Sequence, residues 1–214
     1  MNEIKQLLSI IEKLRGEDGC SWDKDQTIET LTGALIEETY ELVESIEEKK
    51  LEDLKEELGD LIFLSFFIAY IGAQEGRFSL PEIIKSINEK LIRRHPHVFG
   101  ENKESDVTNI LKNWEKIKSN EEKNRNRKSI VDGIPKKLPE IYRFFKILDK
   151  LRRNNVTIEN VDKNFIKEEF DKAISKNSEK EMVEFLKYFL IYCYLNKIDL
   201  PALIRKSEKM LSIF

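Results

Sequence analysis

The sequence predicts an all-α protein that is built from two related helical repeats and forms dimers. Apolar residues recur at intervals of three and four positions in segment after segment, the spacing that gives a helix one apolar face. The segment Ser79–Lys85 returns 120 positions later as Asp199–Arg205, each time after an apolar helix, which indicates a decayed internal repeat. The run Leu61–Ala73 is apolar nearly all round, so it needs a dimer partner or a second domain to cover it.

Periodicity and start signals place the helices in order along the chain. The first is expected at Ile4–Leu14, and a polar loop that carries Trp22 follows it. Trp22 has two interpretations: a hydrophobic lid over the core, or a platform for the ring of a ligand. Further helices are expected around residues 31–46, 57–73, 80–94, 110–118, 141–151, 161–174 and 181–195.

Four carboxylates lie on the apolar faces of the two helices that flank a charged connector, Glu47–Asp53. Each helix offers a pair spaced three positions apart: Glu38 with Glu41, and Glu57 with Asp60. Burying isolated ionised carboxylates is costly, so four of them facing a core need cations. Hard divalent ions such as Mg²⁺ take oxygen ligands and share their shell with substrate phosphates. The pattern therefore predicts a metal site with these four residues as ligands.

The helix that a capping box starts at Ser79 carries three cations on one face: Lys90, Arg93 and Arg94. Cations at a helix end also complement its dipole, so a solvated end is one interpretation and a phosphate-binding face is the other. In the next helix Trp114 and Lys118 lie one turn apart. The two side chains either pack on each other at the surface, or Trp114 stacks on a base while Lys118 binds a phosphate.

The bulk properties exclude several classes of partner. A net charge of −3 and a pI near 5.7 give no general attraction for nucleic acid or anionic lipid. The apolar run Leu61–Ala73 is shorter than the roughly 20 residues that span a bilayer. The first residues show no signal-peptide pattern, and the two cysteines are too far apart for a disulfide framework or a zinc knuckle. We therefore expect a cytoplasmic protein without nucleic-acid or membrane partners.

Five segments, in order, resemble the MazG family of nucleoside triphosphate pyrophosphohydrolases. They are Gly19–Thr27, the signature E-E-x-x-E…E-x-x-D from Glu37 to Asp60, Glu75–Phe78, Arg93–Phe99 and Trp114–Lys118. The resemblance covers about residues 4–150 well. The rest matches weakly as the family's second repeat, in which the acidic signature is broken.

The resemblance implies a MazG-like helical bundle, a homodimer, Mg²⁺ (with Mn²⁺ as a substitute) and hydrolysis of NTPs or dNTPs to the monophosphate and pyrophosphate, as nucleotide-pool house-cleaning. By position, it makes Glu38, Glu41, Glu57 and Asp60 the metal ligands and Lys90, Arg94, Trp114 and Lys118 the nucleotide contacts. It also divides the chain into a catalytic domain (1–120), a charged linker (121–140) and a degenerate second repeat (141–214).

In the expected mechanism, a water activated at the metal attacks the α-phosphorus in line and pyrophosphate leaves. The other site residues stabilise the leaving group, stack on the base and orient the water: Lys90, Arg93 and Arg94, then Trp114 or Trp22, and Glu37 beside the metal ligand Glu38. Two alternatives stay open. One is a catalytically silent helical module that binds a regulatory partner, and the other is a pyrophosphohydrolase for a special nucleotide such as phosphoribosyl-ATP.

Overall fold

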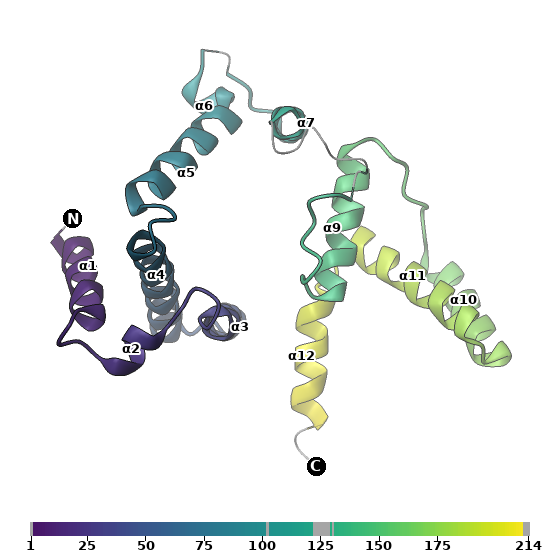
Figure 1. The fold of residues 1–214 in the computed structure, drawn as a ribbon. Helices are drawn as coiled ribbons and strands as arrows, with labels where there is room; N and C mark the ends of the chain where they lie inside the picture. The colour runs from purple at the N-terminus through teal and green to yellow at the C-terminus, as the bar shows by residue number, and fades with distance from the viewer. Residues whose placement is uncertain (1, 102, 122–128, 130, 212–214) are drawn as a thin grey trace. The chain divides into compact units, whose positions relative to one another are not determined.

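The described part of the chain is a series of α-helices (Figure 1). The computed structural model describes residues 2–101, 103–121, 129 and 131–211, and no strand occurs in those ranges, which confirms the all-α prediction. None of the helices in these ranges is long and apolar enough to cross a bilayer. The helices are α1 Asn2–Arg15, α2 Ser21–Asp25, α3 Thr32–Glu48, α4 Leu51–Gln74, α5 Leu80–Arg94, α6 Pro96–Phe99, α7 Val107–Asn120, α9 Glu140–Arg153, α10 Lys163–Lys176, α11 Glu179–Leu195 and α12 Leu200–Leu211.

The helices form two compact units, Met1–Arg93 and Arg94–Phe214. This division lies earlier than the predicted boundary at residue 120. The reason is that α7 packs on α9, where Glu115 of α7 pairs with Arg153 of α9 at 2.9 Å. Helix α7, which was expected to complete the first domain, is therefore part of the second unit. Part of the predicted linker, residues 122–128 and 130, lies outside the described residues.

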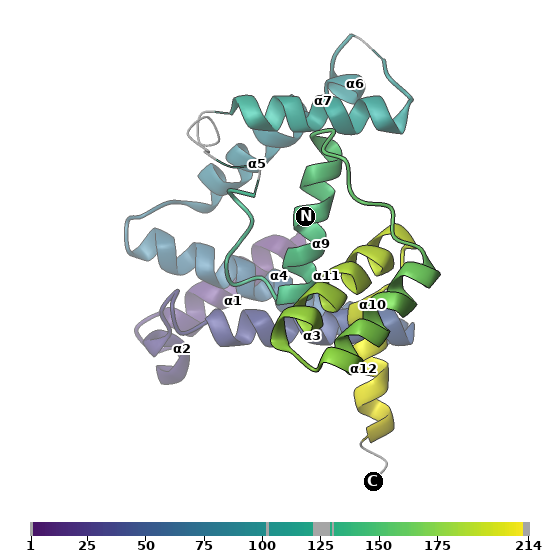
Figure 2. The same ribbon diagram turned by 90° about the vertical axis from the view of Figure 1, so that its right-hand side faces the viewer.

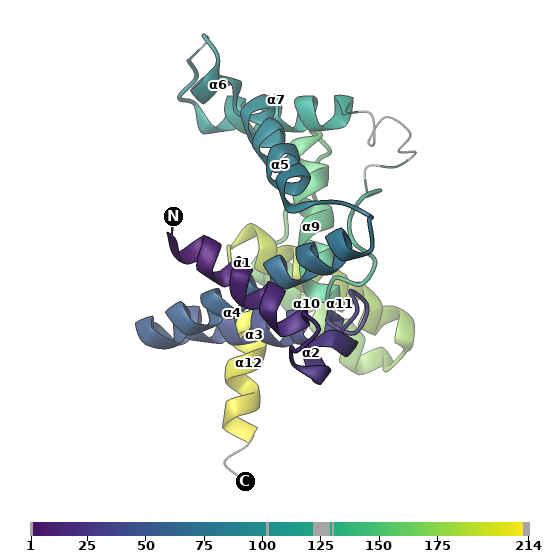
Figure 3. The ribbon, with the colours of Figure 1, turned by 60° about the vertical axis from the view of Figure 1, so that its left-hand side comes forward.

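The first unit has a core where α1 packs against α4 (Figure 3). Ile11 of α1 is completely buried and packs with Leu64, Phe67 and Ile71 of α4. These α4 residues recur at three- and four-residue intervals, so one face of the helix supplies most of this core. Gly72 lies on the same helix, and a Cβ there would come within 2.2 Å of the Phe78 ring, so a larger residue would require the Phe78 side chain to move.

Helices α3 and α4 form a hairpin with a connection much shorter than the sequence suggested. Lys49 adopts a left-handed conformation (φ 57°) and ends α3, and α4 begins two residues later. The predicted connector Glu47–Asp53 therefore reduces to Lys49 and Lys50. The predicted capping box of α5 is confirmed: the Ser79 N–H donates to Glu82 at 2.7 Å, and the Glu82 N–H donates to Ser79 Oγ at 3.4 Å.

The second unit repeats this order of a helix, a hairpin and a following helix. Helix α9 packs on the hairpin of α10 and α11, which run side by side (Figure 2). Leu148, Val161 and Ile191 form the buried centre of the unit, and α10 ends, like α3, in a left-handed residue, Asn177 (φ 46°). The buried Lys150 donates to the backbone carbonyl of Asp132 at 2.7 Å, so its charge is not left without a hydrogen bond.

Candidate functional site

The α3–α4 hairpin brings carboxylates from both helices together. Glu38 and Glu41 lie one turn apart on α3, and Glu57 lies in the second turn of α4. One carboxylate oxygen from each of these three residues lies within 4.8 Å of the others, and no other such group of acidic, histidine or cysteine ligands occurs among the described residues. Glu38 and Glu57 are half-buried and Glu41 is exposed. Asp60, the fourth predicted ligand, is half-buried and lies outside this group.

The carboxylates repel one another. Burial raises the pKa of Glu38, and the charges of Asp60, Glu41 and Glu57 raise it further. Burial also raises the pKa of Glu57, with smaller contributions from Glu41, Glu56 and Asp60. Asp60 is therefore close enough to act electrostatically on both residues. In the described part of the chain, no lysine or arginine forms an ion pair with any of the four predicted ligands.

This arrangement fits a divalent cation. An ion placed among the three glutamates would offset the repulsion between their negative charges. The donors are carboxylate oxygens alone, the set that Mg²⁺ and Mn²⁺ prefer over softer metals. The residues present thus suit the metal that the sequence resemblance implies.

Other predicted residues of the first unit lie apart from this group of carboxylates. Glu37 is exposed and does not belong to the group of three. Trp22 is 66% exposed on α2, so it does not cover the core of its unit and the lid interpretation is wrong. Lys90 is half-buried and Arg93 exposed near the end of α5. Their predicted role toward phosphate remains a prediction.

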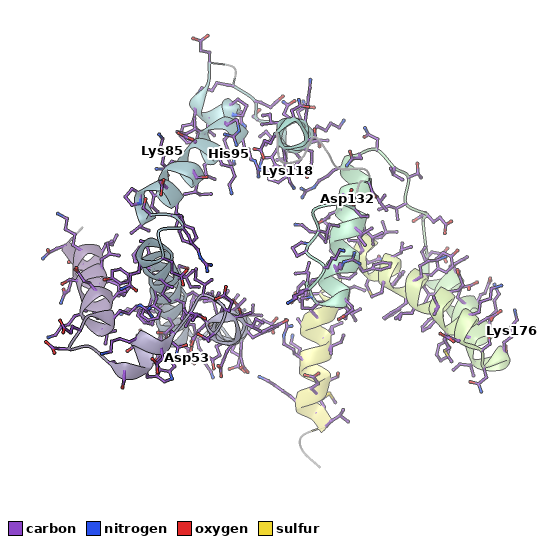
Figure 4. All side chains as sticks on the ribbon, in the orientation of Figure 1. Asp53, Lys85, His95, Lys118, Asp132 and Lys176 are labelled. Carbon is purple, nitrogen blue, oxygen red and sulfur yellow. The ribbon has the colours of Figure 1, made fainter. Side chains whose placement is uncertain are left out.

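The remaining predicted contacts meet around Trp114 in the second unit. Lys118 Nζ lies 4.5 Å and Arg94 Cζ 5.2 Å from the centre of the Trp114 ring. Figure 4 labels Lys118 on α7. Arg94 also donates two hydrogen bonds to Glu121, at 2.9 and 2.6 Å. The structure adds a residue that the sequence reasoning missed, Arg153 of α9, at 5.8 Å from the same ring.

Comparison with known proteins gives a family match to the part of the chain that holds the carboxylates. The model of the MazG nucleotide pyrophosphohydrolase domain matches residues 26–99, which run from before α3 to the end of α6. The matched segment contains all four predicted metal ligands and the cationic end of α5.

Relatives match more of the chain than this domain. A nucleoside triphosphate pyrophosphohydrolase of Escherichia coli (strain K12) is 43% identical over 148 residues, 69% of this chain and 56% of the relative. The nucleoside triphosphate pyrophosphohydrolase/pyrophosphatase MazG of Thermotoga maritima is 44% identical over 137 residues, 64% of this chain and 52% of the relative. The chain therefore spans about half the length of these two curated relatives. A crystal structure of a mazG-related protein from Thermotoga maritima is 34% identical, covers 54% of this chain and 98% of its own, and has a TM-score of 0.48.

Proposed function

Because the chain belongs to the MazG family through residues 26–99, we propose that it hydrolyses nucleoside or deoxynucleoside triphosphates to the monophosphate and pyrophosphate. The observation that carries this proposal is the convergence of Glu38, Glu41 and Glu57, whose carboxylate oxygens lie within 4.8 Å of one another without a cationic partner in the described residues. The names of the Escherichia coli and Thermotoga maritima relatives support the same reaction.

The residues of the α3–α4 hairpin have distinct roles in this reaction. When bound, Mg²⁺ supplies charge neutralisation at the phosphates and activation of water, and Mn²⁺ is its expected substitute. Glu38, Glu41 and Glu57 hold the ion through their carboxylate oxygens, and Asp60 adds negative charge beside them. The raised pKa values of Glu38 and Glu57 make their ionised forms less favourable in the free protein, and a bound cation would offset this. Glu37 is exposed to solvent next to Glu38, a position from which it orients the attacking water.

The cationic residues and the tryptophans are the candidates for binding the substrate. Lys90, Arg93 and Arg94, at the end of α5, attract the phosphate chain and stabilise the leaving pyrophosphate, and Lys118 is a further candidate for contact with a phosphate. Trp114 lies among cations and is the better placed of the two tryptophans to combine contact with a base and with phosphates. Trp22 is exposed and offers a second aromatic surface.

We also propose that the protein acts as a homodimer. Large apolar side chains remain between 42% and 72% exposed on α3 and α4 of the first unit, more than isolated surface residues account for. They are Ile36, Tyr40, Ile46, Leu51, Leu58 and Ile62. A second copy would cover them, and light scattering on the purified chain tests this. A cytoplasmic role in cleaning the nucleotide pool is the expected setting for this activity.

The direct test uses purified protein, Mg²⁺ and each of the common NTPs and dNTPs, and it scores pyrophosphate against orthophosphate. We expect pyrophosphate and the nucleoside monophosphate as the first products. Orthophosphate as the direct product would contradict attack at the α-phosphorus, and no hydrolysis of any triphosphate would favour a silent module or a special nucleotide.

A further inference from the structure

The second unit contains a cavity of about 220 Å³ between α7 and α9. Its size suits a small ligand, since pockets for drug-sized molecules span roughly 300–1,000 Å³. The polar part of its lining comes from the start of α7 and from the end of α9 and the residues after it: Thr108, Lys112, Asp149, Arg152, Arg153 and Asn155. All of these residues belong to Arg94–Phe214, so the cavity is formed by one unit alone.

Two of the four charged side chains in this lining already have partners outside it. Arg153 pairs with Glu115 at 2.9 Å, so its charge is compensated. Asp149, the one carboxylate of the lining, accepts a hydrogen bond from the Tyr194 hydroxyl at 2.8 Å. The remaining two charged residues are both cations, which leaves the cavity with more positive than negative charge.

These two cations, Lys112 and Arg152, form no ion pair in the described part of the chain. Both residues are exposed, and the side chain of Arg152 has a neutral partner, the Tyr194 hydroxyl. Arg152 lies in the last turn of α9, where a cation complements the helix dipole. Lys112 has no such explanation, because it lies in the second turn of α7, nearer to the positive end of that helix. It therefore adds positive charge to the cavity at an electrostatic cost, which an anionic ligand would offset.

We propose that this cavity binds a small anion of the phosphate class, and that Arg152 and Lys112 hold it. A guanidinium offers a planar fork of donors that matches phosphate oxygens, and an ammonium adds a compact charge. Thr108 and Asn155 of the same lining supply neutral hydrogen-bond donors. The phosphate is inorganic phosphate, pyrophosphate or the phosphate group of a nucleoside monophosphate. This site does not depend on the proposed function, because it uses no residue of the α3–α4 hairpin.

Titration calorimetry on the full chain tests this site. A chelator is present throughout, so that no anion is held through a metal ion at the carboxylates of the first unit. The probes are inorganic phosphate, pyrophosphate and AMP at low ionic strength, where electrostatic binding is strongest. Lys112→Ala and Arg152→Ala each remove one cation of the lining, and Arg152→Lys keeps the charge without the fork. Lys116→Ala is the control, since it removes an exposed cation of α7 that does not line the cavity.

We expect saturable binding of at least one probe, weakened roughly tenfold in Lys112→Ala and in Arg152→Ala, the loss typical of one hydrogen-bonded charge. Arg152→Lys should recover part of the loss, and Lys116→Ala should bind as the original chain does. The probe that binds most tightly then identifies the source of the phosphate. Binding of no probe, or equal binding in Lys112→Ala, Arg152→Ala and Lys116→Ala, would overturn the proposal. A loss confined to Arg152→Ala and accompanied by a lower melting temperature would also overturn it, because that pattern indicates a structural role through Tyr194.

Discussion

The two helical hairpins, α3–α4 and α10–α11, have corresponding helices and turns but differ in what surrounds their acidic residues. The left-handed residue that ends α10, Asn177, follows the one that ends α3, Lys49, by 128 positions. Helix α11 likewise begins 128 positions after α4. At this spacing Glu41 corresponds to Glu169, but the other three predicted ligands, Glu38, Glu57 and Asp60, correspond to Ile166, Phe185 and Tyr188.

Three acidic residues of the second hairpin form ion pairs with lysines. Glu169 pairs with Lys172 at 2.6 Å, Glu181 with Lys176 at 2.8 Å, and Glu184 with Lys187. Figure 4 shows Lys176 at the end of α10 that leads into α11. In place of the carboxylate group, the second hairpin packs Phe165 edge-on against Tyr188, with 4.8 Å between ring centres. Both hairpins contain acidic residues, so acid content does not distinguish them. They differ because no ion pair compensates Glu38 or Glu57 in the described part of the chain.

The largest expected difference between the hairpins is in activity. Glu41→Gln and Glu169→Gln alter corresponding positions, one among the converging carboxylates and one in an ion pair with the exposed Lys172. We expect Glu41→Gln to lower kcat/KM by about 100-fold or more, because it removes a metal ligand. Glu169→Gln should stay within about twofold, because a pair with the exposed Lys172 contributes little. Steady-state pyrophosphate release measures the activity of both variants. Equal losses of activity would contradict the proposed difference between the two hairpins.

When the metal is removed with a chelator, Glu38 of the first hairpin and Glu181 of the second should change the stability of the protein in opposite directions as the pH rises. The pKa of Glu38 is raised above its ordinary 4.5 in the folded state. Its contribution to stability is therefore present below pH 4.5 and is lost as pH rises through the raised value. Gln mimics the protonated acid, so Glu38→Gln should be more stable than the original chain at neutral pH and equal to it below pH 4.5.

Glu181 shows the reverse, because hydrogen bonds from Lys176 and Ser178 lower its pKa from 4.5 to about 2. Its contribution is present above pH 4.5 and is lost as pH falls toward 2. Glu181→Gln should therefore destabilise the protein at neutral pH and cease to do so near pH 2. Urea unfolding across this range tests both variants. A Glu38→Gln difference of the same sign as that of Glu181→Gln would contradict the assignment.

The smallest expected effect concerns the start of the second helix in each hairpin. Ser178 caps α11 by accepting from the Glu181 N–H, whereas Lys50 gives α4 no side-chain cap. Ser178→Ala should cost about 1 kcal/mol in the free energy of unfolding. Lys50→Ala should change it by less than about 0.5 kcal/mol, since its ion pairs with Glu48 and Asp53 lie at the surface. Urea unfolding resolves the difference.

Much of the fold follows from the sequence because it depends on local signals. Periodicity located the major helices, and the Ser79–Glu82 spacing located the start of α5. The second hairpin was harder to align, because the motif echo lies at a spacing of 120 and the hairpin ends at 128. Helix α11 has 17 residues and α4 has 24, so no single spacing aligns both features.

The candidate site was predictable where residues share one helix face. The positions of Glu38 and Glu57 on apolar stripes indicated that they point inward, and the structure brings both together with Glu41. Arg153 had no such signal, because its partner Glu115 is 38 positions away and the contact depends on how α7 packs on α9. The exposure of Trp22 could not be predicted either, since a single aromatic residue in a polar loop carries no periodicity.

The central claim is that the carboxylates of the α3–α4 hairpin bind a divalent ion. Calorimetric titration of the metal-free full chain with Mg²⁺ tests it directly, with Glu38→Gln, Glu57→Gln and Glu169→Gln as variants. We predict saturable binding in the original chain and in Glu169→Gln, and its loss in Glu38→Gln and Glu57→Gln. Undiminished Mg²⁺ binding in Glu38→Gln and Glu57→Gln, or no binding in the original chain, would contradict the account.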